Sequence, residues 1–351
     1  MKYDVVALGE LLIDFAPVST DENGYPTMAA KPGGAPCNYL AALKKYGAYT
    51  ALYAKVGTDA FGKMLVHTLK DAGIETSGII EDDSVFTTLA FVTLDDKGER
   101  SFSFARKPGA DTCLRFDELD LSLIDNSKIF HFGTLSLTNE PSKEATQKAV
   151  AYAKKAGKLI TFDPNLRASL WDDLDEAKEQ ILWGLGQADI VKISDEEVDF
   201  LWSCSEEEGA DKLLGEFGVK LAMVTSGAKG AMLKNKNASA FASCPKNVKR
   251  VDTTGAGDIF GGSAVSCILK LGKAPDDLDQ DELAAIAVFA VTAATLSTKK
   301  PGGIPSVPDY EELHETNFIT DLHTSINKIF QLNLKYDIIS GIASGFVFSD
   351  L

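Results

Sequence analysis

The sequence predicts an α/β protein with a mostly parallel central sheet and helices on both of its faces. Through most of the 351 residues, short apolar runs of strand length alternate with longer segments whose apolar residues recur at helical spacing. Several helical segments end at a glycine, among them Gly47, Gly73, Gly157 and Gly218. Strands and helices that alternate in this way are typical of parallel sheets covered on both faces.

The individual elements follow from the apolar runs and from the helical spacing. Strands are expected at residues 4–8, 50–56, 128–132, 158–162, 190–193 and 221–225. Helices are expected at residues 38–46, 63–72, 142–156, 175–185, 196–202, 207–217 and 258–269. Ligands of such sheets bind outside the carboxyl ends of the strands. We therefore expect the functional site where polar residues follow these strands.

Two stretches interrupt the alternation. Residues 13–31 and 85–106 have extended character, with turn residues at 23–24 and 96–98, and Phe104 lies in the second stretch. We interpret both stretches as hairpin insertions that form a small β-sheet lid over the strand ends, where a lid excludes water. The alternative is an ordinary antiparallel extension at the edge of the main sheet.

Composition and charge limit the classes of function. Hydrophobic residues make up 45% and charged residues 25%, which is typical of a globular protein. The net charge of -16 argues against partners that are nucleic acids or anionic membranes. No uncharged run is long enough to span a bilayer, and Glu10 and Asp14 interrupt the N-terminal apolar run, so we expect no signal peptide.

Cysteine usage and chain organisation complete the general expectations. The five cysteines are scattered without a C-x-x-C pair, which favours a reduced, cytoplasmic location and argues against a zinc site. We expect one domain over residues 1–315, with the lid insertions. Residues 316–351 have few charges and several aromatic side chains, and we predict a C-terminal extension without an assigned role.

The motif V-D-T-T-G-A-G-D-I-F-G-G at residues 251–262 carries the clearest chemical signal. Gly255, Ala256 and Gly257 form a turn without bulky side chains at the start of a helix, where free N–H groups and the helix dipole favour an anion. Asp258 follows directly, in position to accept a proton from a hydroxyl that attacks a bound phosphoryl group. The alternative is a glycine turn in which Asp258 only complements the helix dipole.

Two earlier motifs carry residues suited to a sugar. Asp14 follows the first strand, and a carboxylate there could hydrogen-bond two vicinal hydroxyls of a sugar. Gly33 and Gly34 in P-G-G-A-P-C-N precede a helix, and Asn38 offers both a donor and an acceptor from its first turn. The alternative for both is a turn with its cap.

Further polar residues follow the later strands. Asn165 and Arg167 in F-D-P-N-L-R are candidates for contact with the sugar and the transferred phosphate, unless an Asp–Arg pair merely stiffens the loop. Lys192 ends the next strand, and Glu197 belongs to an acidic helix start that suits either hydrated Mg²⁺ or the helix dipole alone. The strand that ends at Thr225 leads into a glycine turn suited to a nucleotide.

Other catalytic motifs are missing. Residues 57–64 have the glycine and lysine spacing of a P-loop, but Met64 stands where a Ser or Thr is required. The glycines at 255, 257 and 261 miss the dinucleotide fingerprint, so an oxidoreductase is a distant third option. No G-x-S-x-G run supports a serine hydrolase, and the four histidines have no metal-ligand spacing.

Together the motifs resemble those of a known family. In order and spacing, residues 32–38 (P-G-G-A-P-C-N), 162–167 (F-D-P-N-L-R) and 252–258 (D-T-T-G-A-G-D) are similar to the signatures of the ribokinase-like PfkB carbohydrate kinases, and most similar to those of its fructokinases. The resemblance covers roughly residues 3–313 and implies a ribokinase-like fold.

The resemblance implies an ATP-dependent kinase that acts on a primary hydroxyl of a sugar. It makes Asp258 the base, and the N–H groups of Gly255, Ala256 and Gly257 the anion hole, with Arg167 beside the reacting phosphate. The sugar site would contain Asp14, Gly33, Gly34, Asn38, Phe104, Arg106 and Asn165. The nucleotide site would contain Lys192, Thr225, Gly227 and Gly230.

The same resemblance implies ions and an oligomer. Glu197 would hold Mg²⁺ through water, although Ser194 replaces the asparagine of the family's N-x-x-E signature. Asp252 and Thr254 would hold a monovalent cation such as K⁺. A homodimer would interlock through the lid sheets.

We therefore predict a kinase that phosphorylates the 6-hydroxyl of D-fructose. One alternative is a kinase of the same family for another small sugar, such as 2-keto-3-deoxygluconate, or for a nucleoside. Another alternative is a non-catalytic sugar-binding regulator on the same fold, although a regulator has no need of a base such as Asp258.

Overall fold

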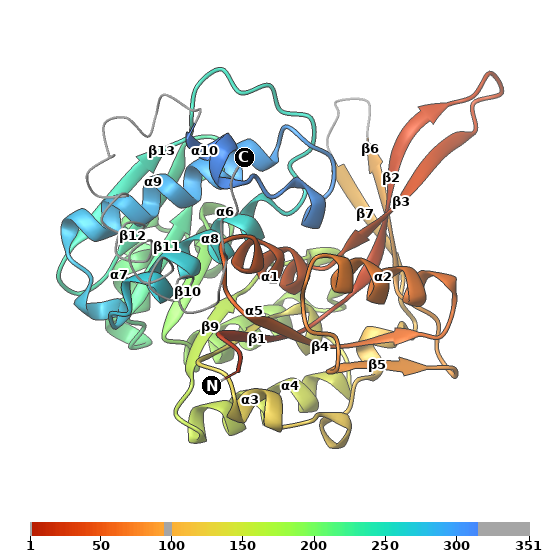
Figure 1. Ribbon diagram of the computed structural model, residues 1–351, viewed down its shortest axis with the longest axis horizontal. Coiled ribbons are helices and arrows are strands. Elements are labelled where there is room, and N and C mark those ends of the chain that lie inside the picture. The colour runs from red at the N-terminus through yellow and green to blue at the C-terminus, as the bar shows by residue number, and fades with distance from the viewer. Residues whose placement is uncertain (1, 95–99, 315–351) are drawn as a thin grey trace, which may run out of the picture.

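The computed structural model describes residues 2–94 and 100–314 (Figure 1). The predicted turn at 96–98 and the predicted extension at 316–351 lie outside the described residues. The main sheet has the strand order β13-β12-β11-β10-β9-β8-β1-β4-β5. In chain order its strands are β1 (Val5–Leu8), β4 (Thr50–Gly57), β5 (Ile79–Asp82), β8 (Ile129–Gly133), β9 (Leu159–Asp163), β10 (Ile190–Ser194), β11 (Leu221–Thr225), β12 (Gly230–Lys234) and β13 (Ser239–Ser243).

The pairing of these strands confirms a mostly parallel sheet. The seven neighbouring strands β11, β10, β9, β8, β1, β4 and β5 pair in parallel. At the other edge, β12 pairs antiparallel with β11, and β13 pairs antiparallel with β12. Consecutive side chains of a strand point to opposite faces. In β1, Val5 and Ala7 enter one hydrophobic core while Val6 and Leu8 enter the other. This two-sided burial explains why the parallel strands are continuous apolar runs.

Helices cover both faces (Figure 1). One core contains residues of α1 (Ala35–Lys45), α2 (Ala60–Asp71), α8 (Ala256–Leu271), α9 (Gln280–Ser297) and α10 (Tyr310–His314). The other contains residues of α3 (Ser122–Asp125), α4 (Ser142–Lys155), α5 (Leu174–Leu185), α6 (Asp195–Trp202) and α7 (Glu206–Glu216). None of the helices in residues 2–94 and 100–314 has the length and apolar character of a membrane span.

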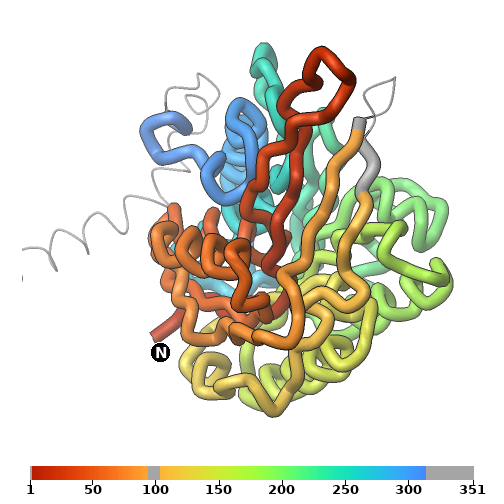
Figure 2. The backbone as a smooth tube through the Cα atoms, turned by 90° about the vertical axis from the view of Figure 1, so that its right-hand side faces the viewer, coloured from red at the N-terminus to blue at the C-terminus, as the bar shows by residue number. Residues whose placement is uncertain are grey.

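A second, smaller sheet has the strand order β3-β2-β6-β7. Its strands are β2 (Leu12–Thr20), β3 (Pro26–Gly33), β6 (Leu89–Leu94) and β7 (Arg100–Ala105). Two antiparallel hairpins, β2–β3 and β6–β7, join through a parallel β2–β6 pairing. Figure 2 shows these four strands running side by side, and Figure 1 shows β2 and β3 projecting away from the helical body. The alternative of an extension at the edge of the main sheet is therefore wrong, and we call this second sheet the lid sheet.

The sequence did not predict β5, the β12–β13 hairpin, the long helix α9, or the short helices α3 and α10. The reason for α9 is physical. It packs against α8 on one side and against β12 and β13 on another, so most of its side chains are buried. A helix that is apolar nearly all round lacks the amphipathic periodicity on which the prediction depends.

Candidate active site

The turn before α8 has the geometry of an anion hole. Gly255 is the N-cap of α8 with φ 75°, a left-handed conformation that favours glycine. A Cβ on Gly255 would lie 2.9 Å from Asn38 Nδ2, so any larger residue would displace Asn38. No side chain caps this helix. The first N–H groups of α8 therefore remain available to an anion, which the helix dipole also favours.

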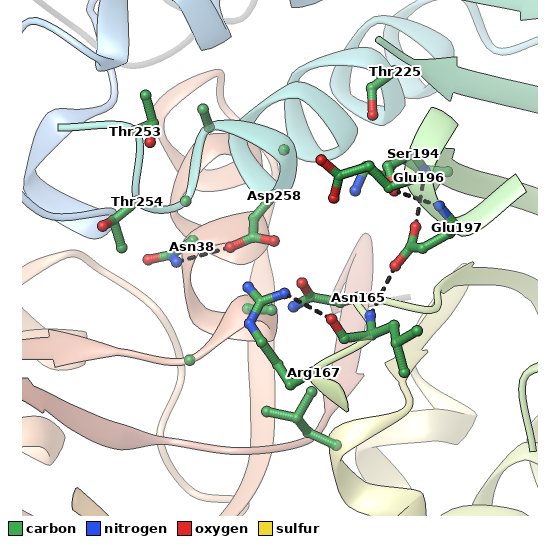
Figure 3. A pocket seen from close by; sticks show the side chains of 18 of the residues that line it. Asn38, Asn165, Arg167, Ser194, Glu196, Glu197, Thr225, Thr253, Thr254 and Asp258 are labelled. Carbon is green, nitrogen blue, oxygen red and sulfur yellow. Dashed lines mark hydrogen bonds between the residues drawn. The ribbon is translucent and has the colours of Figure 1, made fainter. Parts of the chain in front are cut away.

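Asp258 lies in the first turn of α8, at the wall of a large cavity. Its Oδ2 accepts a hydrogen bond of 2.9 Å from Nδ2 of Asn38 on α1 (Figure 3). Burial raises the pKa of Asp258, whereas the Asn38 hydrogen bond and the positive charges of Lys192 and Arg167 lower it. Asn38 on α1 thus orients the carboxylate of Asp258. The other carboxylate oxygen is available to accept a proton from a substrate hydroxyl.

The cavity in front of Asp258 has a volume of about 510 Å³. Residues from the lid sheet, from α1 and from the ends of β9, β10 and β11 surround it. They include Leu12, Asp14, Phe104, Gly34, Asn38, Asn165, Arg167, Lys192, Glu197, Thr225, Gly227, Gly255, Ala256 and Gly257. The structure therefore brings together predicted sugar, phosphate and nucleotide residues that are as much as 244 positions apart, from Asp14 to Asp258.

Positive charge offsets the acids of this cavity. Burial raises the pKa of Asp14 to about 6, and the nearby Arg167 opposes this shift. Arg167 lowers the pKa of Asp258 in the same way. Arg167 lines the same cavity as Asp14 of the lid sheet and Asp258 of α8, where its guanidinium could interact with a bound anion.

Backbone hydrogen bonds hold the loop that carries Asn165 and Arg167. Asn165 has φ 45°, and its N–H donates to Asp163 Oδ1 over 3.1 Å. Glu197 Oε1 accepts from the N–H of Leu166, and its Oε2 accepts from the N–H of Ser194, each over 2.8 Å. Glu197 thus caps α6 and fixes the loop after β9 at the same time (Figure 3).

A buried ion pair lies beneath the glycine turn. Nζ of Lys192 lies 3.2 Å from the carboxylate of Asp163. A Cβ on Gly257 would lie 3.1 Å from the same Nζ. Burial disfavours the ammonium, but Asp163, Glu197 and Asp258 outweigh this and raise the pKa of Lys192. Lys192 therefore stays charged at neutral pH and adds positive potential behind the anion hole.

A second cavity, of about 350 Å³, adjoins the first on the other side of the glycine turn. Both cavities share Thr225, Gly227, Thr253, Ala256 and Gly257. Predicted residue Gly230 lines the second cavity only. The walls of the second cavity also include the apolar side chains of Phe260, Val291 and Ala294, together with Thr295 and Arg250. A pocket with apolar walls that joins an anion hole suits the base and the phosphates of a nucleotide.

Two predicted sugar residues do not line either cavity. Arg106 was expected at the sugar, but its guanidinium is buried against Asp111, with Nε 2.8 Å and Nη2 2.7 Å from Oδ2. Its remaining donors bind the Thr138 hydroxyl and the Leu135 carbonyl. Gly33 lies behind Asp14 instead, since a Cβ there would be 2.2 Å from Asp14 Oδ2. Arg106 therefore acts as a structural residue, and Gly33 makes space for Asp14.

The carboxylates suit Mg²⁺ only with help from water and phosphate. In the part of the chain that the structure describes, no group of three or more His, Cys, Asp or Glu side chains could hold a metal ion. Mg²⁺ usually keeps several waters and binds one or two carboxylates together with substrate phosphates. Glu196 and Glu197 line the main cavity and fit this mode of binding.

The side chain of Asp252 does not fit the monovalent cation predicted for it. Both of its oxygens accept hydrogen bonds from protein groups, two from Thr254, one from the Gly302 N–H and one from the ammonium of Lys31. A cation would have to displace these donors and approach the positive charge of Lys31. The monovalent cation predicted beside Asp252 and Thr254 therefore stays a prediction, and the ammonium of Lys31 competes with it for the carboxylate.

Some residues of the site were missed from the sequence. Glu10 lines the main cavity, is 3% exposed, and accepts a 2.6 Å hydrogen bond from the Ala35 N–H at the start of α1. Its position two residues after β1 was the available signal, because polar residues after a parallel strand face the ligand side. Ala294 in the second cavity was missed as well, because α9 itself was not predicted.

Comparisons with known proteins agree on one family. The family model described as pfkB family carbohydrate kinase matches residues 2–310. Fructokinase-1 of Zea mays is 41% identical over 315 residues, which cover 88% of this chain and 96% of the maize protein. The structure of the fructokinase of Xylella fastidiosa with bound ATP is 28% identical, with a TM-score of 0.83, and covers 92% of this chain and all of that chain.

A further solved structure is a double mutant of the fructokinase of Vibrio cholerae O395, in its fructose-, ADP- and potassium-bound form. It is 32% identical, has a TM-score of 0.78, and covers 90% of this chain and 98% of that one.

Proposed function

Because the chain belongs to the pfkB family of carbohydrate kinases, we propose that it is a fructokinase, which transfers the γ-phosphoryl group of ATP to the 6-hydroxyl of D-fructose. The observation that carries this proposal is Asp258, a partly buried carboxylate that lines the main cavity beside an uncapped helix N-terminus. The glycine turn before this helix lines both the main cavity and the second, nucleotide-sized cavity. A base beside an anion hole suits phosphoryl transfer to an alcohol.

In the proposed reaction, the sugar lies between the lid sheet and α1, where Asp14 and Asn38 bind its hydroxyls. Asp258 accepts the proton of the 6-hydroxyl while the sugar oxygen forms its bond to the γ-phosphorus. The bond from that phosphorus to the β–γ bridging oxygen breaks, and ADP leaves with the electron pair. The first N–H groups of α8, Lys192 and Arg167 stabilise the charge on the transferred group. Bound Mg²⁺ would neutralise phosphate charge, with Glu196 and Glu197 as second partners through water.

The location and the oligomer of the protein belong to the same proposal. We place the enzyme in the cytoplasm, because its five cysteines are all unpaired with one another. We also propose a homodimer through the lid sheets. Three large hydrophobic side chains in or beside these strands support it, Val18, Tyr25 and Phe86, which are 65%, 70% and 55% exposed.

The first test is a panel of sugars in a coupled assay of ADP release. D-fructose, D-ribose, 2-keto-3-deoxygluconate and a nucleoside are compared by kcat/KM, and phosphorus NMR identifies the phosphorylated carbon. We expect fructose to be preferred at least about tenfold, since contacts to one or two hydroxyls distinguish these substrates. Preference for another sugar would replace fructose as the substrate, and sugar binding without ADP release would favour a non-catalytic regulator.

The second test is Asp258→Asn. Removal of a general base lowers kcat by about 10²- to 10⁴-fold, with a modest change in KM because the substrate contacts remain. Asp117→Asn is the matched control, because Asp117 is 72% exposed and pairs only with Arg115 among the ion pairs described for it. A D258N enzyme with near-normal kcat would remove Asp258 from the role of base.

A further inference from the structure

Asp252 joins three separate parts of the molecule. Its Oδ1 accepts hydrogen bonds from the N–H and the hydroxyl of Thr254, over 3.0 and 2.7 Å. Its Oδ2 accepts from the Gly302 N–H over 2.9 Å, and Nζ of Lys31 lies 3.5 Å away. An ionised carboxylate has about four lone-pair sites. Four donors therefore fill the carboxylate of Asp252.

The fourth donor brings a full positive charge from the lid sheet. Lys31 lies on β3, opposite Asp14 of β2, and its side chain is 26% exposed while that of Asp252 is 11% exposed. The stem of Lys31 passes beside the backbone of the loop after α9, since a Cβ on Gly302 would be 3.9 Å from Lys31 Cδ. The ammonium is thus held between the lid, the glycine turn and this loop.

We infer that Lys31 replaces the monovalent cation expected beside Asp252, so that this enzyme does not need potassium. The inference rests on the proposed kinase function and concerns its ion requirement. Asp252 binds the Thr254 N–H directly before the anion hole, so its negative charge lies near the site of the transferred phosphate. A positive charge is needed there to offset it. The lysine supplies that charge from within the chain.

An ion could reach this position once the lysine charge is removed. Lys31 and Asp252 both line a third cavity of about 410 Å³ between the lid sheet and the loop after α9, together with Thr254 and Gly302. Methionine has a similar length and shape but no charge. In Lys31→Met the Asp252 carboxylate therefore loses its charged partner and faces a space that a hydrated K⁺ can enter.

The kinetic test measures ADP release with saturating fructose and ATP, with K⁺ or tetramethylammonium at constant ionic strength. We expect the natural enzyme to change less than about twofold up to about 100 mM K⁺, since its partner charge is covalently attached. K31M is expected to lose about tenfold in kcat without K⁺ and to recover most of that loss with it. Lys31→Arg keeps the charge and should stay independent of K⁺.

Lys236→Met is the matched control. Lys236 forms another lysine–aspartate pair, at 3.0 Å from Asp276, but it lies 62% exposed on the β12–β13 turn and lines none of the three cavities. Its removal should leave both the rate and the potassium response unchanged. A general effect of losing one lysine charge would appear in K236M as well.

A direct readout does not depend on activity. Crystals soaked in Tl⁺ are measured for anomalous scattering beside Asp252. We expect a Tl⁺ peak in K31M and none in the natural enzyme. A peak in the natural enzyme, strong activation of that enzyme by K⁺, or a K31M enzyme that gains neither peak nor potassium response would each overturn the inference. If no sugar is phosphorylated, the proposed function fails, while Tl⁺ occupancy still decides whether Lys31 fills the cation site.

Discussion

Replacement of Glu10 by glutamine should make the protein more stable at pH 8 but not at pH 4.5. Glu10 is 3% exposed, and its carboxylate accepts a 2.6 Å hydrogen bond from the Ala35 N–H. Burial raises the pKa of Glu10 from its ordinary 4.5 to about 7, although the backbone hydrogen bonds oppose this. Glutamine has the same shape, and its amide oxygen can accept the same bond.

The size of the effect follows from the two pKa values. Between pH 4.5 and about 7 the folded protein holds the Glu10 proton while the unfolded chain has lost it, so the free energy of unfolding falls as the pH rises. Below this window both states are protonated, and above it the whole cost is present. An interval of about 2.5 pH units at about 1.4 kcal/mol each gives an upper value of about 3.5 kcal/mol.

The assay is urea unfolding followed by tryptophan fluorescence at several pH values between 4.5 and 8. The Glu10→Gln protein should gain up to about 3.5 kcal/mol at pH 8 and nothing near pH 4.5. Glu216→Gln is the control, because Glu216 is 57% exposed in an i,i+4 pair with Lys212 and should change stability by less than about 0.5 kcal/mol at any pH. A gain from E10Q that is equal at both ends of the pH range would refute the reasoning.

Two other predictions concern packing and the base. Gly262→Ala should destabilise the fold by about 1–3 kcal/mol, because the new Cβ would lie 2.3 Å from the Tyr39 carbonyl oxygen; Gly215→Ala, with no atom within 4 Å of its Cβ, should raise the free energy of unfolding by up to about 1 kcal/mol. Thermal unfolding compares the two variants, and a stable G262A protein would contradict the expected clash. Lys192→Met should move the acid limb of the kcat/KM profile to higher pH, because the ammonium lowers the pKa of Asp258; an unmoved limb would show that Lys192 does not act on the base.

Local sequence patterns predicted the elements whose burial is simple. The parallel strands are buried on both faces and the covering helices on one, so runs such as Leu221–Thr225 and the spacing in Ser142–Lys155 were informative. The fold class is confirmed. The helix α9 was not predicted because it is buried on several sides. The strands β12 (G-A-M-L-K) and β13 (S-A-F-A-S) were not predicted because each is only five residues long and has few large apolar side chains.

The site could be predicted only in part. Motifs identified Asp258, Asn38 and Arg167 because each follows a strand or opens a helix, and the structure places them around one cavity. Their roles remain predictions until they are tested. Sequence could not reveal the partners of a charged side chain. Arg106 forms an ion pair with Asp111, and Asp252 forms one with Lys31. These pairings depend on the folded structure.

The packing of α1 against α8 has a consequence for synthesis of the protein. The α1 segment ends at Lys45, and α8 begins at Ala256. While the ribosome makes the intervening chain, the apolar face of α1 that α8 will cover is open to solvent. Such a surface attracts other nascent chains. Only when the α8 segment has been made can this face be covered and Asn38 meet Asp258, so products truncated before residue 256 should have no enzymatic activity.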